Sequence, residues 1–357
     1  MESDFSVCLA ALEEDLRGVL STWEEAVAPL YQMMQYHLGW LDERFHPVNE
    51  SQGKRLRPLL CLLNCQSVGG DWRRALPAAS AIELVHDFSL IHDDIEDESD
   101  LRRHRPTVWR LWGIAQAINV GDAMWALARL SMLRLLDRGY RADTVLRVVR
   151  LLCETCLELC TGQHLDLAFQ SAQSVSVAHY ERMISGKTAA LFSASAAIGA
   201  ILGAADGRGE PVVAAYRDFG RELGLSYQIM DDILGIWGDP AVTGKSAASD
   251  LIERKKTLPV LYALHWEQEH GHTDLEAIYA QPAMSPDDLL AVLTLLARCG
   301  SREYARNRAR QHRRRALDYL NAAEAADAGE RPIGGQGKDA ARQMLRQLAL
   351  ACVDRDS

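Results

Sequence analysis

The stretch 123–137, AMWALARLSMLRLLD, shows the pattern that decides the fold class. The apolar residues Met124, Leu127, Ala128 and Leu135, at spacings i, i+3, i+4 and i+11, share one face of an α-helix. Arg129 and Asp137 point away from that face. The alternating β-branched runs that are typical of strands are missing from the sequence. The sequence therefore predicts an all-α protein.

Short turns rich in glycine and aspartate separate the predicted helices. Such turns are expected at 69–71, 206–209, 238–240 and 334–337. No internal repeat or long linker divides the 357 residues. We therefore predict one large helical bundle over residues 1–357, with a short lead at 1–20 and a tail at 353–357 as its looser ends.

The charge balance argues against a nucleic-acid partner. The chain has 39 Lys and Arg against 49 Asp and Glu, a formal net charge of −10, so an overall basic footprint is missing. The basic run 306–315 is interrupted by Ala309 and flanked by apolar residues, which favours a solvated helix face.

One uncharged segment, 188–205, reaches the lower length limit of a membrane span. It consists mostly of Ala, Ser and Gly, a composition that suits close packing inside a helical protein, so we expect no membrane span. The N-terminal residues lack the basic and apolar regions of a secretory signal, and eight cysteines are too few for a disulfide scaffold. A cytoplasmic location is expected.

An acidic segment follows an apolar stretch. Six of the eight residues from 93 to 100 are acids, and residues 81–91 are mostly apolar. Asp93 and Asp97 are four residues apart, so their carboxylates share a helical face and repel one another. A cation such as Mg²⁺, which binds a few carboxylate oxygens together with substrate phosphates, removes this conflict. A solvated, acidic helix end is the alternative.

A second acidic pair, Asp231-Asp232, is embedded in apolar sequence between Met230 and Ile233. Buried carboxylates without a partner are costly. Two facing helices that each present Asp-Asp would form one cage for several metal ions. Together the two segments favour a metal–phosphate site.

Basic residues lie beside the acidic segments or near expected helix starts. Arginine and lysine suit contacts with phosphate oxygens. They are found in 53–58 (GKRLRP), at Arg102-Arg103, in 186–188 (GKT), which we expect to open a helix, and at Lys245, Lys255 and Lys256. Each could be a solvated surface charge on its own, but their placement favours diphosphate binding.

In this order, the motifs resemble those of the trans-isoprenyl diphosphate synthases of the polyprenyl synthetase family. The resemblance covers most of the chain and rests on 53–58, 83–86 (ELVH), 93–97 (DDIED), 102–107 (RRHRPT), Gly162-Gln163 with Asp166, 186–188, Gln228 with Asp231-Asp232, Gly244-Lys245 and 250–255 (DLIERK). It implies an all-helical fold with a central cavity and the two aspartate-rich motifs facing each other across its mouth. It also implies a homodimer.

The resemblance implies a role for each matching residue. The aspartates that it makes catalytic are Asp93, Asp94, Asp97, Asp231 and Asp232. Of these, Asp93, Asp97 and Asp231 would bind Mg²⁺ directly, three ions per site, with Asp94 and Asp232 in support. The allylic diphosphate would be held by Arg102, Lys187, Thr188, Gln228, Lys245 and Lys255, of which Lys187 also counts as catalytic. Isopentenyl diphosphate would be held by Lys54, Arg57, His86 and Arg103.

The expected reaction is the Mg²⁺-dependent head-to-tail condensation of isopentenyl diphosphate with an allylic diphosphate. Metal ions stabilise the departing diphosphate, and an apolar cavity shields the allylic cation from water. A class I terpene cyclase of the same fold is one alternative, but it would not need a second diphosphate site. A non-catalytic partner subunit is the other, but none of Asp93, Asp97 and Asp231 is lost.

Two positions depart from the family pattern. Gly235 stands where a third aspartate often follows Asp231-Asp232, and His104 stands where glycine is usual after Arg102-Arg103. Neither position is a predicted metal or phosphate ligand. We expect a changed rate or product rather than inactivity.

Phe88 and Ser89 are the predicted determinants of product length. They lie five and four positions before Asp93, and the two-residue insertion of many bacterial farnesyl-type enzymes is missing. On a helix, Phe88 lies more than one turn below the metal site, where its ring would form the floor of the chain pocket; packing in the core is the alternative. By resemblance, the expected product is geranylgeranyl diphosphate (C20), with farnesyl diphosphate (C15) next.

Overall fold

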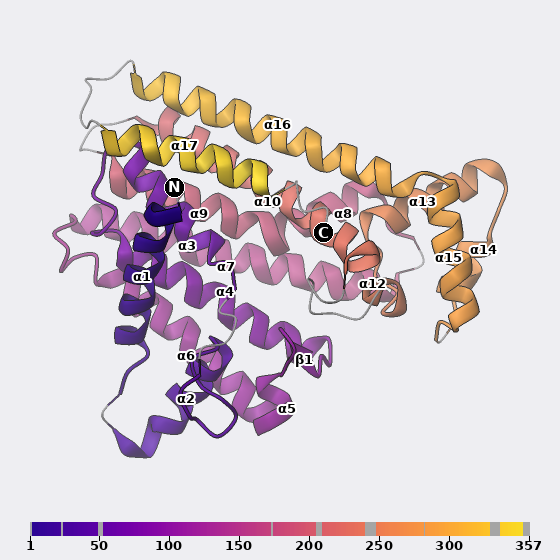
Figure 1. Cartoon of the computed structure of the whole chain (residues 1–357), viewed down its shortest axis with the longest axis horizontal. Coiled ribbons are helices and arrows are strands. Elements are labelled where there is room, and N and C mark those ends of the chain that lie inside the picture. The colour runs from indigo at the N-terminus through magenta and orange to yellow at the C-terminus, as the bar shows by residue number, and fades with distance from the viewer. Residues whose placement is uncertain are drawn as a thin grey trace. The chain divides into compact units, whose positions relative to one another are not determined.

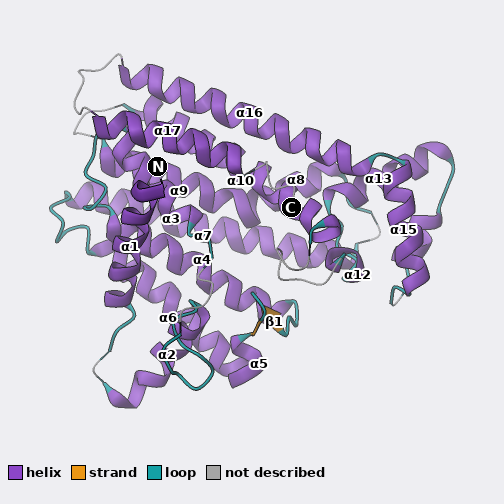
Figure 2. Cartoon of the chain, in the orientation of Figure 1, coloured by secondary structure: helices purple, strands orange, loops and turns teal. Residues whose placement is uncertain are grey.

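Helices make up most of the described part of the chain, and loops join them, as Figure 2 shows. The computed structural model describes residues 2–22, 24–48, 53–172, 174–204, 209–239, 248–281, 283–328 and 336–352. The one sheet found within these residues is a two-stranded antiparallel hairpin. The predicted all-α fold class is therefore confirmed.

The chain forms two compact units. The first consists of Met1–Cys156, Leu191–Arg217 and Leu320–Leu345, and the second of Leu157–Ala190, Asp218–Tyr319 and Arg346–Ser357. Several long helices contribute residues to both units: α7 (Ala142–Ser171), α10 (Glu210–Trp237), α16 (Ser301–Ala328) and α17 (Gln336–Ala351).

The first unit holds the N-terminal helices and the hairpin (Figure 1). Its elements are α1 (Glu2–Val19), η1 (Glu25–Val27), α2 (Ala28–His37), α3 (Leu56–Ser67), α4 (Leu76–Glu96), β1 (Leu101–Arg102), β2 (Arg105–Pro106), α5 (Val108–Trp112), α6 (Ile114–Leu133) and nearly all of α9 (Ala190–Gly203). Helix α4 begins with a proline near its first turn, where the missing N–H costs no hydrogen bond, and packs mainly on α6.

The second unit is built from shorter helices, the C-terminal parts of α7, α10 and α17, and the N-terminal part of α16. Its other elements are α8 (Val177–Ile184), the π-helical turn η2 (Ser185–Ala189), α12 (Ser249–Ile252), α13 (Leu258–His270), α14 (Asp274–Tyr279) and α15 (Pro286–Arg298). Ser285 begins α15 with a capping box, because its side chain accepts from the N–H of Asp288 while the Asp288 carboxylate accepts from the N–H of Ser285.

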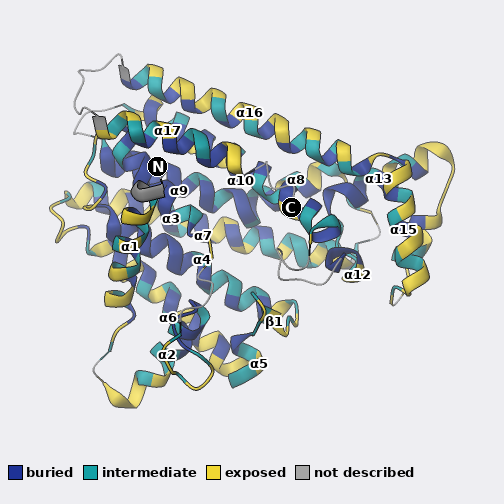
Figure 3. Ribbon diagram, in the orientation of Figure 1, coloured by how far each residue is buried: buried dark blue, intermediate teal, exposed yellow. Residues whose placement is uncertain are grey.

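Helix α9 is a core helix of the first unit, and Figure 3 shows it almost entirely buried. A Cβ at Gly199 would lie 2.1 Å from the carbonyl oxygen of Cys61, so the backbones of α9 and α3 are in direct contact. The segment Val177–Gly203 is long and apolar enough to cross a membrane, but 78% of its most apolar window is buried within the structure. Close packing of small residues explains this composition.

Two sequence predictions differ from the structure. The N-terminal lead is not loose, because residues 2–19 form α1, whose Leu12 and Leu16 are completely buried. The motif 186–188 does not open a helix, since it lies within the π-helical turn η2 that joins α8 to α9. Residues 353–357 lie outside the described part of the chain.

Candidate active site

The first acidic segment lies at the C-terminal end of α4. Asp93 and Asp94 are in its last turn, and Asp97 is the C-cap, whose backbone N–H donates to the carbonyl of Asp93 at 2.8 Å. The C-terminal end of a helix carries a partial negative charge, which the acids increase rather than offset. The end of α4 is therefore suited to attract a cation.

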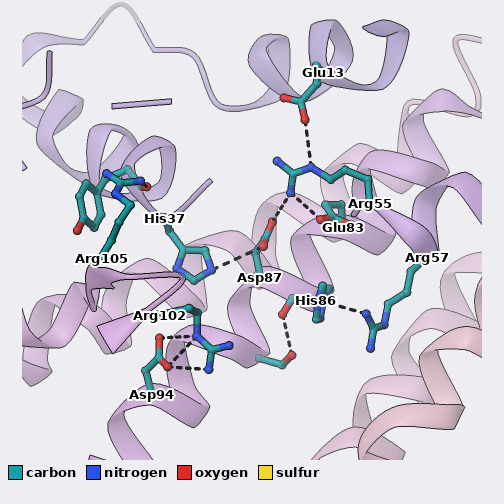
Figure 4. Close-up of polar contacts among 12 residues, drawn as sticks. Glu13, His37, Arg55, Arg57, Glu83, His86, Asp87, Asp94, Arg102 and Arg105 are labelled. Carbon is teal, nitrogen blue, oxygen red and sulfur yellow. Dashed lines mark hydrogen bonds and ion pairs between the residues drawn. The ribbon is translucent and has the colours of Figure 1, made fainter. Parts of the chain in front are cut away.

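Arg102 and Asp94 form a bidentate ion pair (Figure 4). The Arg102 Nε donates to both carboxylate oxygens at 2.8 and 3.0 Å, and its Nη2 lies 2.7 Å from Oδ1. Asp94 is buried, whereas Arg102 is half-buried on strand β1. This pair fixes the hairpin against α4 and keeps an arginine next to the acidic segment.

The hairpin turn explains why glycine is usual at position 104. Arg103 and His104 connect β1 to β2, and both have positive φ angles, of 52° and 64°. Such a two-residue turn needs left-handed backbone at both positions, which a non-glycine residue adopts with strain. His104 tolerates this conformation, and its side chain is exposed.

A basic set in the first unit brings together three of the predicted isopentenyl diphosphate ligands. Arg57 Nη1 donates to His86 Nε2 at 3.2 Å (Figure 4), and the Arg57 guanidinium lies 4.6 Å from the centre of the Phe192 ring. The guanidinium of Arg103 lies across Gly53, where a Cβ would come within 2.7 Å of Nη2. The fourth predicted ligand, Lys54, is exposed beside Gly53.

The environment of His86 keeps this ring neutral. Burial and the positive charge of Arg57 lower the pKa of His86 well below its ordinary value, with smaller contributions from Arg103 and Arg102. The neutral ring accepts the hydrogen bond from Arg57 at Nε2. His86 can therefore orient Arg57 without adding charge.

In the second unit, Lys187 projects from the π-helical turn. Its Nζ lies 2.5 Å from a carboxylate oxygen of Asp166 on α7. A Cβ at Gly162 would lie 2.0 Å from the backbone nitrogen of Lys187, so this glycine lets α7 approach the turn closely. Gly162 and Asp166 of α7 thus hold the turn that carries Lys187 and Thr188.

A chain of hydrogen bonds joins Thr188 to the second acidic pair. Thr188 Oγ1 donates to Gln228 Oε1 at 2.5 Å, and Gln228 Nε2 donates to Asp232 Oδ1 at 2.9 Å. The other oxygen of Asp232 accepts from the Tyr180 hydroxyl at 2.6 Å and from the N–H of Leu258 at 3.2 Å. Burial raises the pKa of Asp232 to about 7, although these hydrogen bonds oppose the rise.

The two acids of the second pair differ in environment. Asp232 is buried in the hydrogen-bond network, whereas Asp231, one position earlier on α10, is exposed. Asp231 is therefore the member of the pair that is open to solvent, and Asp232 is the one held by protein groups.

The space beside Gly235 is filled by a carboxylate from another element. A Cβ at position 235 would lie 1.9 Å from Oδ2 of Asp250, at the start of α12. Position 235 lies one turn after Asp231 on the same face of α10, as Asp97 follows Asp93 in the first acidic segment. The buried Asp250 therefore places a carboxylate where this chain lacks the third aspartate.

Of the two predicted lysine ligands in the segment 245–255, the structure describes Lys255. Lys255 is half-buried in the second unit, with its Nζ 2.8 Å from a carboxylate oxygen of Glu253. Lys245 lies outside the described residues.

The two predicted product-length residues lie on different sides of α4. Ser89 precedes Asp93 by one turn and donates to the carbonyl of His86 at 2.7 Å. The ring of Phe88 lies 5.6 Å from that of Trp125 on α6 and 5.8 Å from the ring of His92, between centres. Phe88 is half-buried, and its ring packs against the Trp125 ring of α6.

The acids fit magnesium bound together with a phosphate ligand. Within the residues that the structure describes, no three His, Cys, Asp or Glu side chains converge to form a metal site made only of protein groups. Mg²⁺ usually takes one or two carboxylates and completes its shell with water and substrate phosphates. Asp93 and Asp97 at the end of α4 in the first unit, and separately Asp231 on α10 in the second unit, are carboxylates that such a phosphate-bound ion could use.

Sequence reasoning left several polar residues of these networks without a role. Tyr180 is separated from Asp232 by 52 positions, and no local pattern connects them. Glu83 belongs to the motif 83–86, and Asp87 follows it by one turn in the apolar stretch before the first acidic segment. Two acids at this spacing in apolar sequence are the signal for a buried cation, and both face Arg55.

The comparisons with known proteins establish the family. The family model described as Polyprenyl synthetase matches residues 39–296. The (2E,6E)-farnesyl diphosphate synthase of Mycobacterium tuberculosis (strain ATCC 25618 / H37Rv) is 42% identical over 332 residues, which are 91% of this chain and 86% of that protein. The chain therefore belongs to the polyprenyl synthetase family.

Relatives that differ in product are similarly close. The geranylgeranyl diphosphate synthase of the same Mycobacterium strain is 42% identical over 273 residues, covering 76% of each chain. The solved structure of geranylgeranyl pyrophosphate synthase from Corynebacterium glutamicum, complexed with isoprenyl diphosphate and magnesium, has a TM-score of 0.77 and 27% identity, with 96% of this chain and 97% of that chain covered. The resemblance found in the motifs is thus confirmed at the level of the family and the fold.

The lowered pKa of His86 predicts a pH effect on stability. Its pKa in the folded state lies below the unfolded value of about 6.5, so the unfolded chain binds more protons as the pH falls below that value. The stabilisation from a neutral His86 is therefore present above this pH and is lost below it. Between about pH 7 and pH 5, the thermal midpoint of the wild type should fall further than that of His86→Gln, as followed by circular dichroism. Parallel curves for the two proteins would contradict the lowered pKa of His86.

Proposed function

We propose that this protein is a Mg²⁺-dependent trans-prenyltransferase that condenses isopentenyl diphosphate head-to-tail with an allylic diphosphate. The observation that carries the proposal is the basic set of Arg57, His86 and Arg103, which accompanies the acidic end of α4 in the first unit. A terpene cyclase ionises one diphosphate and has no use for this additional set. The relatives that are 42% identical carry the names of prenyl diphosphate synthases.

The acids and cations divide into groups with different roles. Asp93, Asp97 and Asp231 bind Mg²⁺, with Asp94, Asp232 and Asp250 in support; three ions per site are expected. The allylic diphosphate is held by Arg102, Lys187, Thr188, Gln228, Lys245 and Lys255. Isopentenyl diphosphate is held by Lys54, Arg57, His86 and Arg103. Support for magnesium comes from the Corynebacterium structure, which is complexed with isoprenyl diphosphate and magnesium.

The reaction needs charge stabilisation rather than a strong base. When bound, Mg²⁺ supplies positive charge to the diphosphate leaving group. Lys187 and Arg102 hold the oxygens of this group while the bond from allylic C1 to oxygen breaks. Arg57 and Arg103 orient isopentenyl diphosphate so that its double bond forms the new carbon–carbon bond to C1, and loss of a proton restores a double bond. The released diphosphate is a suitable acceptor for that proton.

A product assay tests the proposal. Purified protein with Mg²⁺ and geranyl diphosphate should give elongated diphosphates by mass spectrometry only when isopentenyl diphosphate is added. Replacing Asp93 by Asn should lower turnover by about 100-fold or more, because a metal ligand is lost. Asp137→Asn, at an exposed acid of the same unit, is the matched control and should retain turnover.

Two results of this assay would contradict the proposal. Hydrocarbons formed without isopentenyl diphosphate would indicate a cyclase. Near-normal turnover by Asp93→Asn, with an unchanged circular dichroism spectrum, would remove the metal role of Asp93.

We propose geranylgeranyl diphosphate (C20) as the main product, with farnesyl diphosphate (C15) next. Phe88 limits the growing chain because it is the bulky residue five positions before Asp93. Phe88→Ala should lengthen the product by at least one five-carbon unit, as measured by mass spectrometry. Phe45→Ala, which removes an aromatic ring stacked on Trp112 in the same unit, is the control and should leave product length unchanged. Unchanged length in Phe88→Ala would refute the assignment.

We propose a homodimer and a cytoplasmic location. Helix α6 carries exposed large apolar side chains at Ile114, Ile118, Leu130 and Leu133, and Leu146 on α7 is also exposed in the first unit. A second copy of the chain would remove this surface from water. Light scattering should give twice the 39.7 kDa chain mass for the wild type and a shift toward one chain mass for Ile118→Asp with Leu130→Asp. A monomeric wild type would contradict the dimer.

A further inference from the structure

Arg55 is a buried cation with carboxylates on several sides (Figure 4). Only 5% of the residue is exposed. Its Nε donates to Glu13 Oε1 of α1 at 3.0 Å, its Nη1 donates to Glu83 Oε1 of α4 at 2.6 Å, and the same Nη1 lies 3.7 Å from Asp87 Oδ2. Burial opposes the charge of the guanidinium, but Glu83, Asp87 and Glu13 together raise the pKa of Arg55. The group remains a cation inside the unit and cannot reach a substrate.

The backbone around Arg55 has an unusual conformation. Gly53 has a φ of 75°, and Arg55, a non-glycine residue and the N-cap of α3, has a φ of 46°. Left-handed backbone at a non-glycine position is strained and persists only where surrounding contacts hold it. The three carboxylates around the guanidinium are such contacts. They determine how the chain enters α3, two residues before Arg57.

The same carboxylates compensate a second arginine. Burial and the neighbouring charges of Arg55 and Arg102 lower the pKa of Arg103, whereas Asp87 and Glu83 act in the opposite direction. The guanidinium of Arg103 also lies across Gly53, next to the left-handed segment. Glu83 and Asp87, one turn apart on α4, therefore stabilise two cations, Arg55 of the segment 53–57 and Arg103 of the hairpin turn.

Asp87 is held from its other side by α2. His37 Nε2 lies 3.6 Å from Asp87 Oδ1, and the neighbouring His37 and Arg55 contribute to a lowered pKa of Asp87 even though burial acts to raise it. Asp87 directly follows His86 in the chain. The contacts of Asp87 and the hydrogen bond from Arg57 to His86 thus lie on successive residues of α4.

We propose that Arg55 is a positioning residue for recognition of the isopentenyl diphosphate group. It makes no contact with substrate. Its ion pairs with Glu83 and Asp87 hold the segment 53–57 so that the contacting residues lie ready before substrate arrives: Lys54, Arg57, His86 and Arg103. The inference rests on the proposed function, because these four residues are the ones proposed there to hold isopentenyl diphosphate.

A purely structural role is the competing explanation, since buried ion pairs also connect helices without serving a site. The first unit contains a suitable comparison. Arg134 makes a bidentate pair with Asp15, at 2.7 and 3.0 Å, and that carboxylate also accepts from Ser80. Arg134 has no place in the proposed binding groups, so weakening its pair should affect folding alone.

The test compares Arg55→Lys with Arg134→Lys in steady-state kinetics and thermal unfolding. Lysine keeps the charge at position 55 but cannot bridge Glu13 and Glu83 as the planar guanidinium does. For Arg55→Lys we expect KM for isopentenyl diphosphate to rise about fivefold or more, with KM for the allylic diphosphate and kcat within about twofold of wild type. Arg134→Lys should lower the thermal midpoint but leave both KM values within about twofold.

Glu83→Gln provides a second variant if Arg55→Lys does not fold. It keeps an oxygen acceptor for Arg55 and removes one buried charge, and it should produce the same selective rise in KM. A lowered thermal midpoint with an unchanged KM for isopentenyl diphosphate in the folded variant would overturn the positioning role, as would an equal rise in both KM values. A wild type that does not elongate would overturn the proposed function itself, which is a different result.

Discussion

The ion pair between Arg55 and Glu83, 2.6 Å long and nearly excluded from water, illustrates the constraint on which the first unit depends: each buried charge needs an opposite charge beside it. A buried charge must be compensated, because its transfer from water costs more than packing can recover. In the first unit, α4 provides the compensation with Glu83 and Asp87, and two turns later it carries the acids of the first aspartate-rich motif. One helix therefore supplies both the anionic support for the arginines and the carboxylates proposed to bind metal.

The second unit meets the same requirement in another way. Lys187 is paired with Asp166, and the buried Asp232 accepts hydrogen bonds from Tyr180, Gln228 and the backbone of Leu258. The glycine at 235 and the carboxylate of Asp250 are complementary, because a side chain at 235 would occupy the position of Asp250 Oδ2. The glycine at 235 thus leaves room for the carboxylate of Asp250 beside α10.

Much of the fold and of the candidate site could be predicted from local sequence. The apolar periodicity in 123–137 predicted a helix, and α6 extends over most of that stretch. The motif 53–58 was placed near a helix start, and α3 begins at Leu56. Contacts across long sequence separations were not predicted. The role of Arg55 depends on φ at its own position and on carboxylates 42 and 28 residues away, and the π-helical turn at 186–188 has no simple hydrophobic pattern.

We propose that positive charge from Mg²⁺ and from the basic residues allows a chain of net charge −10 to bind diphosphates. Calorimetric titration of the wild type with an unreactive thiolo analogue of dimethylallyl diphosphate, with Mg²⁺ and with a chelator, tests this most directly. We expect an affinity at least about tenfold higher with Mg²⁺, a difference of about 1.4 kcal/mol or more. Equal affinity in the two conditions would contradict a role of Mg²⁺ in diphosphate binding.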